Sequence, residues 1–316
     1  MLVTVSLLCF IISSCEVDDS GSADYNDNDK GGKKDKGSDT DTDTDTDTDA
    51  DTDADTDTDG DSDSDDDGCA EQNKFVYAVD TDGSFYRFRP LEKQFELVGV
   101  LNCQAGGATP FSMAVDRDGT AWVLHSTSFS SCAGIYAVDT ETAECTGKTP
   151  FQCGNNNFSL FGMGYATDGS DTSDETLYIG STGGLGSGGR LGALDTDTWT
   201  ANAIGSMPAG GPEFTGNALG ELWGFFPQTN PPKIAQIDKS TGQELVTWPL
   251  NDLSSSANAW AFAFWGGDFY IFYKTTSNQS TNVWKVSNGT LQLHMQNTGK
   301  RIVGAGVSTC APIDLE

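Results

Sequence analysis

The feature that most constrains this chain is a strand–turn–strand plan that returns about every 40 to 50 residues, the spacing of propeller repeats. Its clearest copy is PFSMAVDRDGTAWVL, residues 110–124, in which two apolar-alternating runs flank an Asp-Gly turn. Asp-Gly supplies the backbone freedom that a tight hairpin needs, so each run predicts a strand. A hairpin repeated at this spacing is typical of the inner two strands of a propeller blade.

Five copies of this plan predict an all-β fold over residues 69–316, a single five-bladed β-propeller with four-stranded antiparallel blades. Turns rich in Asp, Asn, Ser and Gly separate the third and outer strands, because these residues stabilise turn conformations. The Gly and Ala content of the inner strands suits five strands that crowd around one axis. The predicted inner strands are Phe111–Val115, Phe161–Tyr165, Phe214–Ala218, Trp260–Phe264 and Ile302–Gly306.

The two ends of the propeller predict how the ring closes. The first blade lacks one strand at its start, and the chain has a spare C-terminal strand, IVGAG, at 302–306. Pairing the two leaves no open edge across the ring. Cys69 stands just before the first strand and Cys310 just after the last, so we predict a Cys69–Cys310 disulfide. On loop-entropy grounds it would stabilise the fold by about 4 to 5 kcal/mol.

The other four cysteines of the propeller region can pair in three ways. Strand directions place Cys103, Cys132 and Cys153 on one face and Cys145 near the other, which leaves the pairing open. An even number of cysteines after an export signal favours disulfides. A zinc site is disfavoured, because the region has no Cys-x-x-Cys pair and its two histidines, His125 and His294, are far apart in sequence.

The N-terminus predicts export and a lipid anchor. Residues 2–12 form an apolar stretch that suits a signal-peptide core and is too short for a spanning helix. It ends in Ile12-Ser13-Ser14-Cys15, which resembles the lipobox of bacterial lipoproteins. The resemblance implies a signal peptide over residues 1–15, lipidation of Cys15 and anchoring to the outer membrane or cell surface. The alternative is an ordinary signal peptide with a chance cysteine.

Residues 16–68 read as a disordered, acidic, Asp-Thr-rich linker. They hold 23 of the 47 acidic residues and 4 of the 17 basic ones, a net charge of −19. Such a segment cannot bury a core and repels itself into an extended chain. Asp55, Asp57, Asp59 and Gly60 match half of an EF-hand loop, but a repeat of this kind matches by chance in several registers. We therefore expect weak Ca²⁺ binding at most, and no other cofactor.

Taken together, the lipobox, the Asp-Thr spacer and the repeats resemble the surface lipoproteins of myxobacterium-type Gram-negative bacteria. The propeller resembles the broad group with NHL, WD40-like and quinoprotein-like repeats. It lacks the Gly-His/Trp-Asp repeat and the Trp-docking repeat of that group. No catalytic residue of these families can be assigned to a position in this sequence. The resemblance therefore implies a cellular location and an architecture rather than an activity.

A ligand site is expected where the inner strands begin, because loops of several blades meet there in a funnel. Glu213 and Arg301 are the only charges just before the five inner strands. They either pair with each other or orient a peptide, protein or glycan ligand against Phe111 and Trp260. The predicted rim comprises Thr109, Phe111, His125, Glu213, Asn258, Trp260 and Arg301, with Asn157 and Phe158 at the same level.

We interpret the propeller as a non-enzymatic recognition or scaffold module, and expect a monomer. The alternative is a secreted propeller hydrolase such as a glycosidase, which needs two facing carboxylates. Only Glu213 is acidic among the inner-strand starts, and a serine hydrolase would have only His125 or His294 as its base. Nucleic acid is excluded as a partner, because a net −11 propeller region behind a −19 spacer repels phosphate.

Overall fold

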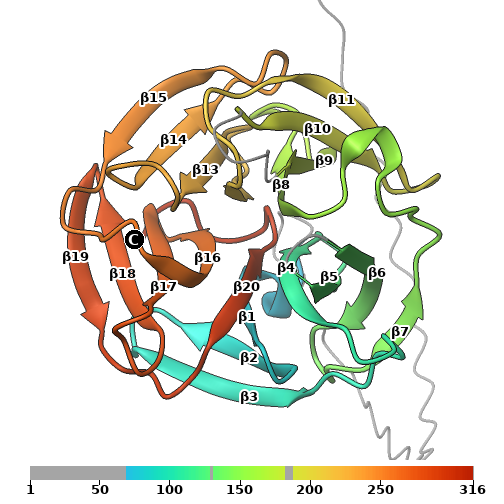
Figure 1. Ribbon diagram of the computed structural model, residues 1–316, viewed down its shortest axis with the longest axis horizontal. Coiled ribbons are helices and arrows are strands. Elements are labelled where there is room, and N and C mark those ends of the chain that lie inside the picture. Colours follow the sequence, from blue (N-terminus) through green and yellow to red (C-terminus); the bar gives the residue numbers. More distant parts are fainter. Residues whose placement is uncertain (1–68, 129–130, 182–187, 316) are drawn as a thin grey trace, which may run out of the picture. The chain divides into compact units, whose positions relative to one another are not determined.

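The computed structural model describes residues 69–128, 131–181 and 188–315. These residues form five four-stranded antiparallel sheets arranged in a ring (Figure 1), so the predicted five-bladed propeller is confirmed. Two short 3-10 helices, η1 (Glu71–Lys74) and η2 (Asn155–Asn157), are the helical elements of this part of the chain. The predicted signal peptide, the lipidation of Cys15 and the acidic linker with its weak Ca²⁺ binding lie outside the described residues.

Each blade is numbered by its place in the chain, and its strands run from the inner to the outer position. Blade 1 holds β20 (Ile302–Val307), β1 (Val76–Asp80), β2 (Ser84–Arg89) and β3 (Gln94–Val100). Blade 2 holds β4 (Thr109–Val115), β5 (Thr120–Ser128), β6 (Ser131–Asp139) and β7 (Cys145–Lys148). Blade 3 holds β8 (Phe161–Thr167), β9 (Glu175–Ser181), β10 (Arg190–Asp195) and β11 (Thr200–Ser206). Blade 4 holds β12 (Glu213–Gly216), β13 (Leu222–Phe226), β14 (Lys233–Ile237) and β15 (Glu244–Pro249). Blade 5 holds β16 (Ala257–Trp265), β17 (Asp268–Thr275), β18 (Asn282–Ser287) and β19 (Thr290–Met295).

Ring closure follows the prediction. The C-terminal strand β20 pairs antiparallel with β1, with Tyr77 opposite Gly306, and supplies the inner strand of blade 1. A disulfide joins Cys69 to Cys310, with 5.7 Å between their Cα atoms. The first and last blade segments are therefore held by both a strand ladder and a covalent bond, as expected for a propeller whose ends share one sheet.

Glycines let the inner strands approach one another closely near the axis. A Cβ on Gly162 of β8 would collide with the backbone of Pro212, and one on Gly164 would lie 2.6 Å from the carbonyl oxygen of Phe214. Gly216 of β12 meets the backbone of Tyr165 and Ala166 in the same way. The small residues seen in the sequence thus allow backbone-to-backbone contact between blades 3 and 4.

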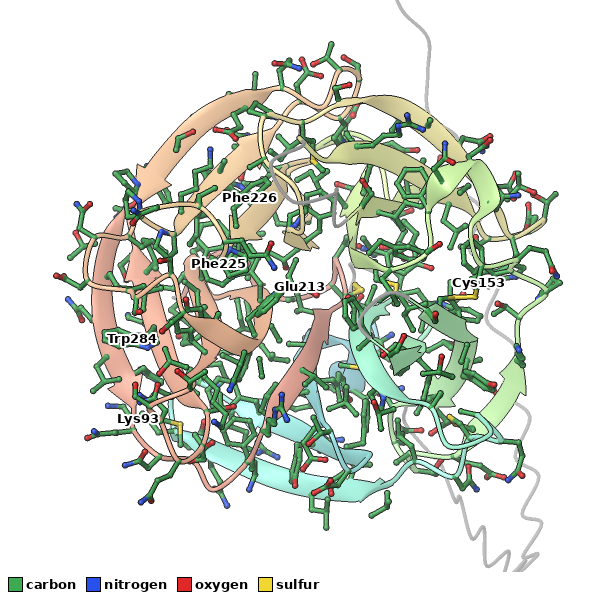
Figure 2. All side chains as sticks on the ribbon, in the orientation of Figure 1. Lys93, Cys153, Glu213, Phe225, Phe226 and Trp284 are labelled. Atoms are coloured by element: carbon green, nitrogen blue, oxygen red, sulfur yellow. A yellow bond between two sulfur atoms is a disulfide. The ribbon has the colours of Figure 1, made fainter. Side chains whose placement is uncertain are left out.

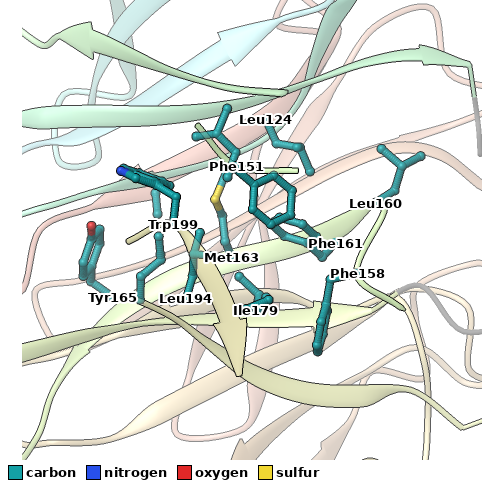
Figure 3. Close-up of a cluster of buried hydrophobic side chains, with 14 residues drawn as sticks. Leu124, Phe151, Phe158, Leu160, Phe161, Met163, Tyr165, Ile179, Leu194 and Trp199 are labelled. Carbon is teal, nitrogen blue, oxygen red and sulfur yellow. The ribbon is translucent and has the colours of Figure 1, made fainter. Parts of the chain in front are cut away.

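Away from the axis, aromatic and aliphatic side chains fill the space between neighbouring blades. Blades 2 and 3 share a buried cluster that includes Leu124, Phe161 and Met163 (Figure 3). Ring pairs cross other interfaces, with 5.2 Å between the centroids of Phe88 and Phe272. Offset and edge-on pairs of this kind add to the energy of apolar burial. The aromatic residues of the strands therefore serve mainly as packing between blades.

The blades twist so strongly that each outer strand runs along the circumference (Figure 1). Its end lies against the third-to-outer turn of the next blade, as Gly99 does against Ala143 and Gly205 against Thr241. Cys103, which follows β3, therefore reaches Cys145 at the start of β7, and the two form a disulfide. The prediction that these two cysteines lie on opposite faces is wrong, because it ignored this twist.

The remaining disulfide joins Cys132 to Cys153, two residues that the sequence placed on one face. Three disulfides in one domain indicate an extracellular or periplasmic protein, since reducing compartments do not maintain them. Within the described ranges, no helix has the length and apolar character needed to cross a membrane.

Candidate functional site

A cavity of about 740 Å³ lies at the face where the inner strands begin. We call it the central cavity. Its volume is typical of pockets that hold small organic ligands. Four blades contribute to it, and six of the seven predicted rim residues are part of its wall. The lining consists of Thr81, Gly107, Thr109, Pro110, Phe111, Ser126, Thr127, Ser128, Glu213, Gln228, Ala257, Asn258, Ala259, Trp260, Arg301 and Val303.

Three inner strands carry a β-bulge at the level of this cavity. The ladder register shifts between Pro110 and Ser112 on β4, between Ala257 and Ala259 on β16, and opposite Val79 and Asp80 on β20. Each shift leaves one extra residue, and all three line the cavity: Phe111, Asn258 and Val303. A bulge re-aims a side chain that regular pleating would send elsewhere. The bulges thus account for three of the lining residues.

The inner strand of blade 3 has no bulge, and none of the described residues of blade 3 lines the cavity. Its inner strand β8 pairs with β9 without a register shift, from Phe161 to Thr167. The bare Gly162 on β8 leaves room for Glu213 of blade 4, since a Cβ there would lie 2.8 Å from the Glu213 Cα. The Ser112 hydroxyl of blade 2 donates to Glu213 Oε2 at 2.7 Å. Blades 2 and 4 therefore meet directly beside Gly162 of blade 3.

Glu213 lies near the middle of the ring (Figure 2) and only 3 % of its surface is exposed. Burial raises the pKa of its carboxyl well above the ordinary value, and the hydrogen bond from Ser112 offsets this only in part. Burial thereby disfavours the charged form of this carboxyl. A neutral carboxyl can donate a hydrogen bond as well as accept one.

Arg301 does not pair with Glu213, which settles one of the two alternatives that the sequence left open. Its Nη2 donates instead to the backbone oxygen of Asn258 at 3.0 Å. No ion pair of Arg301 occurs within residues 69–128, 131–181 and 188–315. The guanidinium is exposed at the cavity mouth.

Asn258 presents a buried acceptor that has no partner. Its side-chain Oδ1 is shielded from solvent, and no donor of the described residues reaches it. A buried polar atom without a hydrogen bond costs about 1 to 3 kcal/mol, so such atoms usually have a functional reason. Because Asn258 lines the central cavity, a ligand in the cavity is well placed to supply the donor.

His125 is the predicted rim residue that the structure places elsewhere. Its imidazole is 2 % exposed, lies 3.3 Å through Nδ1 from the Val123 oxygen, and packs on the Tyr136 ring. Burial lowers the pKa of this imidazole, which keeps it neutral. The sequence prediction was wrong because His125 faces the blade interior, and its neighbours Ser126 to Ser128 line the cavity instead.

Asn157 and Phe158 also lie away from the central cavity. Phe158 is fully buried in the cluster between blades 2 and 3, and Asn157 belongs to η2. Sequence reasoning missed Val303, Gln228 and the hydroxyl residues around Ser126. The composition of a strand does not reveal where its ladder will bulge, so no sequence signal identified Val303.

A second cavity, of about 510 Å³, lies on the opposite face beside the closing disulfide. Glu175 stands next to it, and its Oε1 accepts the backbone N–H of Arg117 at 3.0 Å while its Oε2 accepts the Thr309 hydroxyl at 2.7 Å. Burial raises the pKa of Glu175 to about 7, although these two hydrogen bonds lower it. The Arg117 guanidinium also donates to Thr309, at 3.2 Å. This group of residues ties blades 2 and 3 to the C-terminal closure.

The chemistry available to the central cavity is limited by its titratable groups. Among the described residues of its lining, Glu213 is the one acidic side chain and Arg301 the one basic side chain. The two facing carboxylates that glycoside hydrolysis requires are not among the lining residues. In the described part of the chain, no group of three His, Cys, Asp or Glu side chains is arranged to hold a metal ion.

No protein-family model and no curated protein matches the sequence. Among solved structures, the chain resembles hydrazine synthase of Kuenenia stuttgartiensis, with 12% identity over 70% of this chain and 64% of that chain, and a TM-score of 0.40. It therefore spans less than two thirds of that chain. It also resembles the PQQ-bound aldose sugar dehydrogenase of Streptomyces coelicolor, with 10% identity over 73% of this chain and 80% of that chain, and a TM-score of 0.44.

A gluconolactonase of Xanthomonas campestris gives a similar result, with 17% identity over 69% of this chain and 71% of that chain, and a TM-score of 0.41. Likenesses at these identities and TM-scores carry no argument about activity. The propeller architecture of this chain stands on its own strand order and register.

Proposed function

We propose that this chain is an exported lipoprotein, anchored through Cys15 at the outer membrane or cell surface. Its propeller acts as a non-enzymatic recognition module, and the central cavity binds a glycan or a peptide. The three disulfides agree with export. The position of Cys69 agrees with a cavity that stays open to ligands outside the cell. The acidic linker would join the propeller at Cys69, on the face opposite to the cavity mouth.

One observation carries the proposal. Six residues far apart in sequence, from four blades, line one cavity in which a buried acceptor lacks a partner. Aromatic faces, hydroxyls, amides and a single exposed cation form a mixed lining that suits a polar organic ligand. A lining with one carboxyl and no neighbouring base supports binding more than turnover.

The binding claim is tested by blocking the cavity from within. Val303→Trp places a large side chain at a half-buried bulge position of the lining, whereas Val303→Ile changes little volume and is the matched control. The wild-type domain and both variants are screened against immobilised glycans and a random peptide library. We expect retention by the wild type and Val303→Ile, and loss in Val303→Trp at an unchanged melting temperature. Equal retention by Val303→Trp would place binding outside the central cavity.

The non-enzymatic claim is tested with a panel of chromogenic glycosides and esters. We expect no turnover by the purified domain. Hydrolysis that disappears in Glu213→Gln would instead establish the alternative, a secreted propeller glycosidase, since Glu213 is the one carboxyl in the lining.

The proposed membrane anchoring is tested separately, by the Cys15→Ser variant. Loss of the acylated cysteine should move the protein from the membrane fraction to the soluble fraction, because acyl chains supply the anchor. Labelling with a radioactive or alkynyl fatty acid should disappear in the same variant. A variant that stays in the membrane fraction would contradict the lipoprotein proposal and leave the cavity proposal untouched.

A further inference from the structure

The central cavity holds one permanent charge in a domain of the opposite sign. Residues 69–316 carry 24 acidic and 13 basic residues, yet the charged side chain at the cavity mouth is Arg301. Glu213, the other ionisable group of the described lining, is buried, and burial raises its pKa and so disfavours its charged form. The cavity therefore favours an anionic ligand by its local charge, although the surrounding domain is negative.

Arg301 has donors left for such a ligand. Its one hydrogen bond to the described residues uses Nη2, and the acceptor is the Asn258 backbone oxygen. A guanidinium has five N–H donors in a planar fork, which fits a carboxylate with two parallel hydrogen bonds. The contact with Asn258 limits the positions open to the guanidinium at the mouth while leaving most of its donors unused.

The Asn258 side chain adds a requirement for a donor. Its Oδ1 is buried and has no hydrogen-bond partner among the described residues. Because the residue Asn258 belongs to the cavity lining, an O–H or N–H of the occupant would satisfy this oxygen once the side chain turns it toward the cavity. Hydroxyl and amide side chains line the same cavity, among them Thr109, Ser126 and Gln228. Groups of this kind can both donate and accept, which matches the alternating demands of sugar hydroxyls.

The apolar part of the lining consists of ring faces and small residues. Trp260 and Phe111 are half-buried, and each contributes to the cavity wall. Aromatic faces of this sort suit the flat C–H face of a pyranose ring. Ala257 and Ala259 complete the wall next to Trp260. This combination favours a saccharide over a peptide, whose side chains would require apolar pockets of their own.

We propose that the central cavity binds a carboxylated saccharide, whose carboxylate is held by Arg301, whose hydroxyl donates to Asn258 Oδ1, and whose ring lies against Trp260. The proposal rests on the proposed function, and it names the ligand class for the same cavity. Phosphorylated or sulfated sugars share the negative charge, and the test distinguishes them.

The test uses a glycan panel with matched charge variants. It contains oligomers of galacturonate and glucuronate and sialylated oligosaccharides, each beside its neutral methyl ester, together with sulfated and phosphorylated sugars and a peptide library. Binding is measured by calorimetry on the wild-type domain. We expect a carboxylated glycan to bind roughly 10- to 100-fold more tightly than its methyl ester, as for one charged hydrogen-bond pair.

Two variants attribute the preference to residues. Arg301→Gln should bring the acid down to the affinity of its ester and leave the ester unchanged. The matched control is Arg190→Gln, because Arg190 is also exposed and also donates to a backbone oxygen, that of Asn156, but lies outside the cavity lining. Asn258→Ala should weaken binding of acid and ester equally while raising the melting temperature, because it removes an unsatisfied buried atom.

Each remaining outcome overturns part of the proposal. The domain could instead prefer neutral sugars, sulfated or phosphorylated sugars, or peptides. If Val303→Trp abolishes that binding, the carboxylated saccharide is refuted and the proposed recognition function stands. A preference for acids that survives Arg301→Gln would refute the role of Arg301. Absence of any cavity-dependent binding across the panel and the peptide library would refute both proposals together.

Discussion

Two glutamates, one partly buried and one fully buried at opposite ends of neighbouring blades, show how differently this propeller treats the same side chain. Glu175, at the start of β9, receives two hydrogen bonds and belongs to the group that ties the C-terminal closure to blades 2 and 3. Glu213, at the start of β12, is more deeply buried and receives one, from Ser112. Both have raised pKa values, but only Glu213 borders the central cavity.

The different hydrogen bonding of the two carboxyls distinguishes a carboxyl buried for the stability of the fold from one buried beside a binding cavity. At Glu175, donors from Arg117 and Thr309 satisfy both carboxyl oxygens, so the group is a closed network of the kind that specifies a fold. At Glu213, the protein leaves hydrogen-bonding capacity facing a cavity and accepts the cost of desolvation. Incomplete satisfaction of buried polar groups is a usual mark of binding sites.

The largest effect should come from opening the closure beside Glu175. Cys69→Ser with Cys310→Ser releases a loop of 241 residues in sequence separation and should cost about 5 kcal/mol of unfolding free energy on loop-entropy grounds. Thr309, next to Cys310, should loosen, and the pKa of Glu175, which accepts a hydrogen bond from the Thr309 hydroxyl, should shift. Denaturant unfolding and NMR titration of the Glu175 carboxyl measure the two effects.

Cys103→Ser with Cys145→Ser is the matched control, because it also removes one disulfide, with a sequence separation of 42. It should destabilise the domain but leave the Glu175 titration unchanged. Equal shifts of that titration in both double variants would contradict the link between the closure and Glu175. If the first double variant does not fold, Thr309→Val tests the same link with the disulfide intact.

Glu213→Gln should give the next largest change, seen at alkaline pH. The folded pKa of Glu213 lies above its unfolded value, so its protonated form contributes stability at low pH that is lost as the pH rises through the folded pKa. Gln removes that loss. We expect a higher melting temperature for the variant at pH 9, with a gain larger than for Glu175→Gln, because Glu213 is more buried and has fewer donors. Equal pH profiles for wild type and variant would mean that the carboxyl is hydrated.

Glu175→Gln should change the pH dependence of stability over a narrower pH range than Glu213→Gln does. With the pKa raised from 4.5 to about 7, Glu175 contributes stability below about pH 4.5 that is lost by about pH 7, at a cost of up to about 3 kcal/mol. The variant should therefore show a flatter fall in stability between these two values. Asp116, whose pKa burial also raises, repels the Glu175 carboxylate, so the difference curve reports Glu175 together with this repulsion. A difference curve that stays level from pH 4 to pH 8 would argue against the raised pKa.

Ser112→Ala should have the smallest effect, since it removes one hydrogen bond. The loss of the donor to Glu213 should cost about 1 kcal/mol of unfolding free energy and raise the Glu213 pKa further. Differential scanning calorimetry at pH 5 and pH 8 measures the first effect, and NMR titration the second. A fall in the Glu213 pKa would show that water enters the space left by the hydroxyl.

Most of the fold could be predicted from the sequence because each blade is specified locally. Alternating apolar runs, turn residues and the spare C-terminal strand determine the strand order, and Cys69 and Cys310 indicate the closure. The pairing of Cys103 with Cys145 could not be predicted, because it depends on how far each blade twists. Twist accumulates over whole strands and leaves no mark on a single residue.

For the candidate site, the sequence predicts which strand ends come together, but not every side chain that lines the cavity. Asn258, Trp260 and Arg301 follow from position along the inner strands, whereas the lining by Val303 depends on a bulge that adjusts one strand to its neighbour. His125 was misplaced for another reason, because it keeps the regular register of β5, opposite Gly134, and its ring packs against Tyr136. Burial of Glu213 likewise depends on the missing side chain of Gly162 in another blade.

The Cys69–Cys310 bond also determines how the propeller would bear a mechanical load. A pull on the chain at Cys69 does not reach β1 alone, because the sulfur bridge passes the force directly to the segment that follows β20. Peeling β1 away from the ring one hydrogen bond at a time is therefore blocked until the bridge is reduced. A module held by its N-terminal end in a flowing medium would keep its innermost strand, and with it the floor of its cavity, under tension.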